Sequence, residues 1–339
     1  MTSDAPSDAP TPEIVFQILN SYQQTAALRA AIHLDLFTAI GGGHDTVSAV
    51  ARRCNATERG ARILCDYLTI VGLLKKHDGR YSLSRDAAVF LDRRSPAYIG
   101  SIADFLVRAD TLDVFMDLAD TIRDPHASLA GRAAMEPENP IWVEFARAMA
   151  PLMIFPAQAI AEMVGAASGE KWKVLDIAAG HGMFGITIAK LNPNAEIFAL
   201  DWAPVLELAS QNARAAGIGD RHHLLPGSFF ERDLGVGYNL VLITNFLHHF
   251  DMSTNEALLK KVREALAPGG RVVVLEFVPN DDRVTPPLAA AFSMTMLGHT
   301  TAGDAYTFAE YDSMFRNAGY SRSEIRALPG PMSVILSVA

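Results

Sequence analysis

The sequence predicts an α/β protein whose second half forms a mostly parallel sheet and whose first third is mainly helical. From residue 172 onward, short apolar strands alternate with helical segments, which is typical of a parallel sheet covered by helices on both faces. A turn containing Gly180 and Gly182 follows the first of these strands and opens a helix, so backbone N–H groups can approach a ligand there. The chain has 339 residues, half of them hydrophobic, which is enough for two globular domains.

Composition narrows the class of protein further. The net charge of −9 argues against wholesale nucleic-acid binding. The two cysteines, Cys54 and Cys65, give no disulfide framework, so we expect a reduced, cytoplasmic protein. The acidic, proline-rich start has neither the basic end nor the apolar core of a signal peptide, and no apolar run approaches the ~20 residues that a membrane span needs. We therefore expect no membrane partner.

The N-terminal third predicts a small helical lobe. Residues 13–40 carry apolar residues at helical spacing and predict one long helix that stops at three glycines. Thr46 and Thr57 are predicted N-caps of two further helices, which end near Arg53 and Leu74. A hairpin that turns at Asp78-Gly79 follows, and this order of elements resembles a winged helix.

A winged helix suggests two roles, DNA binding or dimerisation. Residues 51–85 hold eight Lys or Arg against three Asp or Glu, which is the main sequence argument for DNA binding. The long apolar helix 13–40 has no role in a DNA-binding winged helix, and the helix that begins after Thr57 also has an apolar face. We therefore favour a dimerisation domain.

The chain divides into four predicted segments. They are a disordered tail (1–12), a winged-helix-like dimerisation domain (13–100), a helical connector that contributes to a substrate pocket (101–170) and a ligand-binding α/β domain (171–339). Within the connector we expect several helices, interrupted at Asp124-Pro125, by the loop GRAAMEPENP (131–140), and at Pro151 and Pro156. Proline cannot donate a helical hydrogen bond.

The α/β domain is predicted strand by strand. Its parallel strands are expected at 173–177, 196–201, 223–226, 240–245 and 271–277, and the helices between them near 184–191, 203–216 and 253–267. A helix over 308–318 precedes two more strands, 320–328 and 332–338. Because only Pro329-Gly330-Pro331 joins these two, we expect an antiparallel C-terminal hairpin at one sheet edge.

Three features locate a ligand site at the carboxyl ends of these strands. The first is the glycine turn, and the second is Asp201, which ends the next strand and can accept hydrogen bonds from ribose hydroxyls. The third is a pair of polar strand ends, residues 245–249 and Glu276. Ligands of open α/β sheets bind at such ends, so we expect all three features at one site.

The turn itself discriminates between cofactors. A dinucleotide fingerprint would need glycines at 178, 180 and 183, but the sequence has Ala178 and Met183. The pattern D-x-A-x-G-x-G from Asp176 to Gly182, with LAPGGRVVV (266–274) and FRNAGY (315–320), resembles the class I S-adenosylmethionine-dependent methyltransferases. FLHHFD (246–251) and VLEFVP (274–279) look like the small-molecule O-methyltransferases of the caffeic acid and hydroxyindole type, including bacterial natural-product relatives.

This resemblance implies a Rossmann-like methyltransferase domain and S-adenosyl-L-methionine as the cofactor. Gly180 and Gly182 would pass under its methionine part, Asp201 would bind its ribose, and Trp202 would lie beside the adenosine. Ser228 and Phe229 stand where the family contacts adenine. Asp176 would orient the turn, and Asn245 completes the predicted cofactor site. The family's winged-helix lobe also dimerises, which implies a homodimer.

The same resemblance assigns the chemistry. His248 matches the family's general base and Glu276 the acid that orients it, so the implied reaction methylates a hydroxyl of an aromatic or polyketide-like small molecule. A carboxylate beside an imidazole favours its protonated form, which assists proton removal from the acceptor. The candidate pocket residues are Phe155, Met183, Phe292, Met296 and His299.

One departure from the family leaves alternatives open. The family has a second carboxylate just before the last helix, where this sequence has Ala305, with Asp304 and Glu310 nearby but out of register. His248 and His299 could instead pair on a metal, as in relatives that methylate the carbon alpha to a keto acid, although we assign no metal site. The other alternative is a transcription regulator built on a degenerate methyltransferase.

Overall fold

The computed structural model describes residues 10–129 and 139–339, which form two compact units divided between Val107 and Arg108. The predicted tail, 1–12, lies mostly outside the described residues. No helix among the described residues is both long and apolar enough to cross a bilayer.

The N-terminal unit is helical and contains one small hairpin. Its elements are α1 (Glu13–Leu19), α2 (Tyr22–His33), α3 (Leu36–Gly41), α4 (Val47–Arg53), α5 (Glu58–Ile70), β1 (Leu74–His77), β2 (Arg80–Leu83), α6 (Arg85–Phe90) and α7 (Ala103–Leu106). Thr46 and Thr57 cap α4 and α5 as predicted, because each side-chain oxygen accepts a backbone N–H. The hairpin turns at Asp78 and Gly79, which both have positive φ.

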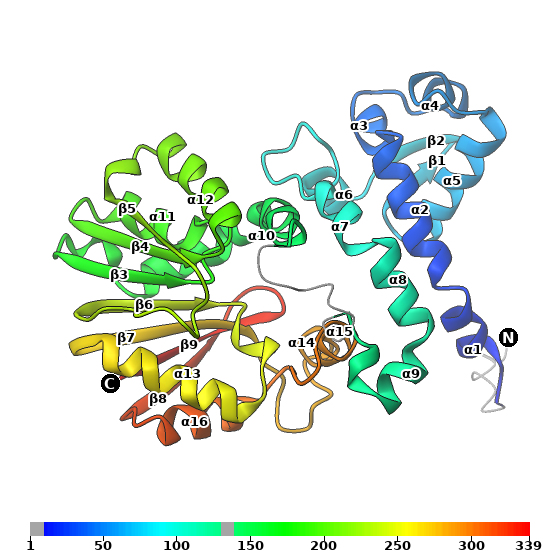
Figure 1. Ribbon diagram of the computed structural model, residues 1–339. Helices are drawn as coiled ribbons and strands as arrows, with labels where there is room; N and C mark the ends of the chain where they lie inside the picture. The colour runs from blue at the N-terminus through cyan, green and yellow to red at the C-terminus, as the bar shows by residue number, and fades with distance from the viewer. Residues whose placement is uncertain (1–9, 130–138) are drawn as a thin grey trace, which may run out of the picture. The chain divides into compact units, whose positions relative to one another are not determined.

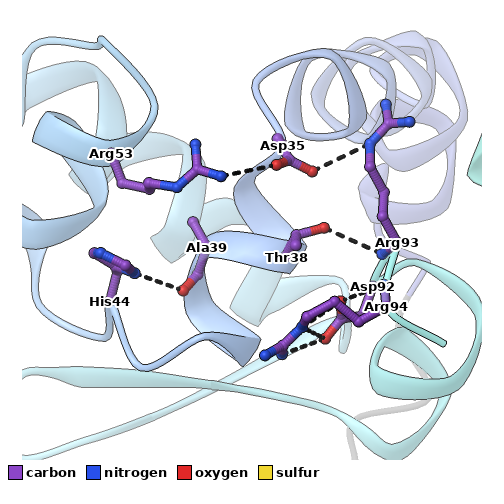
Figure 2. Close-up of polar contacts among 8 residues, drawn as sticks. All are labelled: Asp35, Thr38, Ala39, His44, Arg53, Asp92, Arg93 and Arg94. Carbon is purple, nitrogen blue, oxygen red and sulfur yellow. Dashed lines mark hydrogen bonds and ion pairs between the residues drawn. The ribbon is translucent and has the colours of Figure 1, made fainter.

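The prediction of one long helix over residues 13–40 is wrong, because the chain breaks into α1, α2 and α3. The second break is at Asp35, whose φ of +56° lies in the left-handed region. Figure 2 shows what this conformation achieves: the Asp35 carboxylate accepts hydrogen bonds from Arg53 at 3.3 Å and from Arg93 at 3.1 Å. These ion pairs join segments that are distant in sequence, so local helical spacing does not reveal the break.

The segment after α6 is fastened to α3 by the same network. The backbone N–H of Arg93 donates to Thr38 Oγ1 at 3.1 Å, and Arg94 pairs with the Asp92 carboxylate (Figure 2). A Cβ at Gly41 would meet the Asp92 carboxylate and the Arg94 guanidinium, so a larger residue there would displace this ion pair. The helix after Thr57 also ends earlier than predicted, at Ile70, because Gly72 takes a φ of +85° before β1 begins.

Among the described residues, three α-helices precede the sheet of the C-terminal unit, and most of the predicted loop 131–140 lies outside the described residues. The three helices are α8 (Ala109–Met116), α9 (Leu118–Arg123) and α10 (Ile141–Met163). The prediction that Pro151 and Pro156 interrupt the helices is wrong, because both lie inside α10. This helix buries Met153, Pro156 and Ile160 in the core beside the sheet. Tertiary packing therefore outweighs the hydrogen bonds that the two prolines remove.

The predicted α/β alternation is confirmed. The strands are β3 (Trp172–Ile177), β4 (Ala195–Asp201), β5 (His222–Pro226), β6 (Tyr238–Thr244), β7 (Leu266–Phe277), β8 (Arg322–Ala327) and β9 (Met332–Val338). The helices are α11 (Met183–Leu191), α12 (Ala203–Ala215), α13 (Met252–Ala265), α14 (Pro287–Ala290), α15 (Phe292–His299) and α16 (Phe308–Asn317). β7 begins five residues before the predicted 271, after α13 ends at Ala265.

The described strands of this unit form one seven-stranded sheet with the order β5-β4-β3-β6-β7-β9-β8. Strands β3 to β7 pair in parallel, whereas β9 pairs antiparallel with both β7 and β8, which confirms the predicted C-terminal hairpin. In Figure 1, α11 and α12 cover one face of the sheet and α13 and α16 cover the other. Strand order reverses between β3 and β6, which is where α/β sheets bind ligands.

Candidate functional site

The glycine turn after β3 combines left-handed backbone with an open surface. Gly180 and Gly182 have φ of +55° and +75°, and Ala178 also takes a positive φ, +51°. A Cβ at Gly182 would lie 3.1 Å from the Ala209 Cβ, so this glycine packs against α12. A Cβ at Gly180 would meet no neighbour closer than 3.8 Å. The backbone at Gly180 is therefore free on the side from which a ligand can approach.

Asp201 at the end of β4 is tied to this turn. Its two carboxylate oxygens accept the backbone N–H of Gly180 at 2.8 Å and its neighbour Trp202 at 2.7 Å. Burial raises the pKa of Asp201 to about 6, because these two hydrogen bonds offset only part of the desolvation. Asp201 thus fixes the position of the turn while its remaining lone pairs stay available to hydroxyl donors.

Asp176 lies beneath the turn, fully buried. One carboxylate oxygen accepts the Gly185 N–H at 3.1 Å, and the other has no hydrogen-bond partner among the described residues. Burial, with a smaller contribution from the charge of Asp201, raises the pKa of Asp176 to about 7. A Cβ at Gly185 would lie 2.5 Å from the Ile197 Cγ2, so α11 begins in close contact with the sheet. The sequence prediction did not include Gly185 among its site residues.

His181 is a second residue of the turn that sequence reasoning missed. Its Nδ1 accepts the N–H of Met183, the first residue of α11, at 3.1 Å, and Asn212 of α12 donates to its carbonyl at 2.9 Å. Burial lowers the pKa of His181 to about 4, so the ring is neutral at physiological pH and can accept this hydrogen bond. The ring caps a helix whose N-cap residue, Gly182, has no side chain.

His248 and Glu276 lie in direct contact, as the sequence predicts for a base and its orienting acid. His248 belongs to a 3₁₀ turn, Leu247–His249, that follows β6, and Glu276 lies near the end of β7. The imidazole Nδ1 lies 2.5 Å from Glu276 Oε2, and the two side chains are 6% and 0% exposed. Since a carboxylate only accepts, the ring hydrogen of the neutral imidazole lies on Nδ1 and the lone pair on Nε2.

Glu276 also organises the backbone around His248. Its Oε1 accepts the backbone N–H groups of Phe246 at 3.0 Å, Leu247 at 2.9 Å and His248 at 3.4 Å. On the opposite side, the buried Asn255 of α13 donates to the carbonyl of Leu247 at 2.9 Å. We name residues 246–250 the catalytic turn; its peptide groups are held by a carboxylate on one side and an amide on the other. Asn255 is a further residue that sequence reasoning missed.

Aromatic rings surround the imidazole. Phe292 of α15 stacks on Phe277, with ring centroids 3.9 Å apart, and meets His248 edge-on at 4.9 Å. His249 is adjacent to His248, and Trp142 of α10 meets it edge-on at 6.2 Å. These rings give the surroundings of His248 an apolar, flat character that suits a planar organic molecule.

His299 and Asn245 provide polar atoms near these rings. His299 donates from Nδ1 to the Thr295 carbonyl at 2.8 Å, so its Nε2 carries a lone pair; burial lowers its pKa. Asn245, at φ +52°, has a buried Oδ1 without a partner among the described residues. Within those residues, no group of three or more His, Cys, Asp or Glu could hold a metal ion.

The other predicted residues have diverse environments. Phe229 is 4% exposed, packs on Phe246 in the core and lies beneath the Lys261 ammonium at 4.9 Å. Ser228 accepts the Phe230 N–H at 3.2 Å, which shapes the loop after β5. Met296 is buried in α15, whereas Phe155 on α10 is 51% exposed.

The departure at Ala305 has a structural counterpart. Ala305 is fully buried, and the neighbouring carboxylates of Asp304 and Glu310 both pair with Arg283. In the described residues, Glu276 is therefore the carboxylate hydrogen-bonded to His248.

Two family models and several known proteins match this chain. A family model for an O-methyltransferase domain matches residues 143–321, and a family model for an O-methyltransferase dimerisation domain matches residues 16–93. A 3-hydroxy-5-methyl-1-naphthoate 3-O-methyltransferase from Streptomyces sahachiroi is 30% identical, covering 99% of this chain and 98% of its own length.

Solved structures share the fold over nearly the whole chain. A candidate O-methyltransferase from Nostoc punctiforme is 48% identical, with a TM-score of 0.91 over 98% of this chain and 100% of its own. Human N-acetylserotonin methyltransferase, solved in complex with S-adenosylmethionine, has a TM-score of 0.82 at 20% identity and covers 98% of this chain and 99% of its own.

The hydrogen bonds of Glu276 predict the effect of Glu276→Gln. The amide oxygen will keep the three backbone N–H groups, so its NH₂ will face His248 Nδ1 and move the ring hydrogen to Nε2. We expect this tautomer change in ¹⁵N-edited spectra of the His248 ring, together with a loss of about 1–3 kcal/mol in the free energy of unfolding. The His299 ring, held by Thr295, serves as the internal control. An unchanged His248 tautomer would contradict the assigned geometry.

Proposed function

The chain belongs to the S-adenosylmethionine-dependent O-methyltransferase family, and from that premise we propose that it methylates a hydroxyl of an aromatic or polyketide-like small molecule with His248 as the general base. The contact between His248 and Glu276 carries the assignment of the base. It holds the imidazole Nδ1 2.5 Å from Glu276 Oε2, so the lone pair of the neutral ring lies on Nε2, which suits removal of a hydroxyl proton.

The residues of the turn fit the cofactor. The open backbone at Gly180 can accommodate its methionine part, and Asp201 retains lone pairs for ribose hydroxyls. The Oδ1 of Asn245, which has no hydrogen-bond partner among the described residues, is an acceptor suited to the amino group of the methionine part. Trp202, Ser228 and Phe229 are proposed to complete the cofactor's surroundings. When bound, S-adenosylmethionine supplies an electrophilic methyl group on a sulfonium.

The chain's own contribution is to position the acceptor and take its proton. Phe292 is placed to contact a flat ring, because it lies edge-on to His248 and is itself stacked on Phe277. His248 Nε2 receives the hydroxyl proton, and the Glu276 carboxylate stabilises the imidazolium that forms. Phe155, Met183, Met296 and His299 remain proposed pocket residues. The naphthoate relative supports a fused aromatic acceptor bearing a hydroxyl group.

The acceptor class is tested by incubating the chain with S-adenosylmethionine and a panel of hydroxynaphthoates, phenols, hydroxyquinones and keto acids. We expect O-methylated products from hydroxyaromatic acceptors, and His248→Ala will lower kcat by about 10²–10⁴-fold with nearly unchanged cofactor affinity. His223→Ala is the matched control, because it removes a histidine of β5 that pairs with Glu196 of β4 outside the site, and it should retain most activity. Full turnover by the His248 variant would exclude its role as base.

The pKa of Asp201 predicts pH-dependent cofactor binding. Both oxygens of a carboxylate accept hydrogen bonds from hydroxyl groups, whereas one oxygen of a carboxylic acid carries a hydrogen. Protonation of Asp201 therefore weakens cofactor binding. Affinity for S-adenosylhomocysteine, the demethylated product, should therefore rise as pH increases through about 6 and then level off. Calorimetry should show that Asp201→Asn lowers affinity about tenfold or more and removes this rise. The control variant Asp176→Asn should still show the rise in affinity with pH. If the affinity of Asp201→Asn also rose with pH, the assignment of Asp201 to the ribose would be contradicted.

We further propose a homodimer formed through residues 13–100. In α1 every residue is at least partly exposed, and Ile14, Phe16 and Ile18 are 65%, 60% and 66% exposed. A groove of about 360 Å³ in the same unit is lined by Ala27, Ile63, Leu64 and Tyr67 among others. An exposed apolar helix and an apolar groove on one unit favour a self-complementary interface with a second copy.

The dimer is tested by the variant Phe16→Asp. Light scattering should give twice the 36.7 kDa chain mass for the unmodified protein and a monomer for this variant, because a charge on α1 cannot be buried unpaired. Val236→Asp is the control, since Val236 is 70% exposed but lies in the C-terminal unit. A dimer that persists in Phe16→Asp would contradict a role for α1.

A further inference from the structure

The segment between α15 and α16, residues 300–307, packs against the catalytic turn; we name it the strap. Gly303 is the point of closest approach, because a Cβ there would collide with the carbonyl oxygen of His248 and lie 3.0 Å from the carbonyl carbon of His249. The Gly303 N–H donates to Thr300 Oγ1 at 2.9 Å, which shapes the strap where it meets the turn. The strap backbone at Gly303 therefore packs directly on the backbone of His248 and His249, with no room for a side chain between them.

A second contact joins the strap to the end of the catalytic turn. Tyr306 is 5% exposed, and its hydroxyl donates to the carbonyl of Phe250 at 2.7 Å. The strap thus contacts the peptide groups on the side opposite to Glu276. The N–H groups of the turn are held by Glu276, and its carbonyls are held in part by the strap.

Arg283 ties the strap to the loop that follows β7, the strand of Glu276. Its guanidinium donates from Nη1 to Asp304 Oδ2 at 3.0 Å and from Nη2 to the Glu310 carboxylate. Asp304 lies next to Gly303 in the strap. Glu310 accepts the Thr307 N–H at 2.8 Å in the capping box of α16. Arg283 therefore fastens the strap directly at Asp304 and, through Glu310, at Thr307.

The backbone around Arg283 is built to present this side chain. Arg283 has a φ of +55°, a conformation in which glycine or asparagine would be less strained. The loop is internally hydrogen-bonded: Asn280 donates to Thr285 Oγ1 at 2.8 Å, and Asp282 accepts the N–H groups of Val284 and Thr285, both at 2.9 Å. The loop that presents Arg283 is therefore well defined in geometry.

We propose that Arg283 is a positioning residue: through Asp304 and Glu310 it holds the strap against the catalytic turn and so fixes the His248 imidazole. The inference rests on the proposed role of His248 as base. The carboxylates near Ala305 act on the guanidinium rather than on the imidazole, and their effect reaches His248 through the backbone of Gly303. Loss of Arg283 leaves the cofactor contacts at Gly180 and Asp201 in place but lets the imidazole shift.

The first test compares Arg283→Ala with Arg316→Ala. Arg316 is the matched control, because it pairs with Asp312 at 2.7 Å on the surface of the same α16 helix but does not touch the strap. With a hydroxynaphthoate that the unmodified chain methylates, we expect Arg283→Ala to lower kcat about ten- to hundredfold, with calorimetric affinity for S-adenosylhomocysteine unchanged. Arg316→Ala should keep its kcat. Equal kcat values in both variants, or a matching loss of cofactor affinity in Arg283→Ala, would overturn the proposal.

Rescue of activity distinguishes a positioning role of Arg283 from a general effect on stability. Arg283→Lys can reach only one carboxylate at a time, so its kcat should fall between those of Arg283→Ala and the unmodified chain. Millimolar guanidinium should restore part of the activity of Arg283→Ala but not that of His248→Ala. Absence of rescue by both routes would show a merely structural role and contradict the proposal.

The inference can also be tested without an acceptor substrate, by a measurement that does not depend on turnover. Hydrogen exchange of the amides of Phe246, Leu247 and His248 should be faster in Arg283→Ala and unchanged in Arg316→Ala, with equal melting temperatures. Unchanged exchange in Arg283→Ala would overturn the inference even if the chain proves to be an active O-methyltransferase. Conversely, exchange could be faster only in Arg283→Ala while the chain methylates no acceptor. Arg283 would then still position the turn, but the proposed function would be refuted.

Discussion

The buried carboxylate of Glu276 is the interaction on which the site depends. A charge that is fully removed from water must be neutralised or hydrogen-bonded, and Glu276 receives three backbone N–H groups and one imidazole N–H. The same contacts that satisfy the charge also orient His248. Residues 246–250 therefore adopt their conformation because the carboxylate requires donors, and the His248 imidazole is aligned as a consequence.

Much of this arrangement could be predicted from the sequence because the parallel sheet gathers strand ends. Once residues 176, 201, 245 and 276 are assigned to ends of parallel strands, their proximity follows from topology. The polar character of these ends on otherwise apolar strands marks the site. The motif resemblance then identifies S-adenosylmethionine as the cofactor, whereas the strand-end residues alone do not distinguish it from other nucleotide-like ligands.

The features that the sequence could not predict depend on contacts between distant segments. Asp35 breaks a helix because Arg53 and Arg93 converge on it, and Asn255 supports the catalytic turn from a helix whose spacing predicts only a buried face. Ala178 takes a left-handed conformation that its side chain does not favour. In each case the deciding energy comes from tertiary packing, whereas propensity and periodicity describe only the local chain.

The antiparallel position of β9 ties the strand of Glu276 to a distant segment of the chain. Glu276 pairs with Ser333 across β7 and β9, so without residues 332–338 the side of β7 that faces β9 would expose its backbone hydrogen-bonding groups. A truncation that removes β9 would therefore open the sheet next to the buried carboxylate. The C-terminal hairpin is thus part of the support of Glu276 as well as an edge of the sheet.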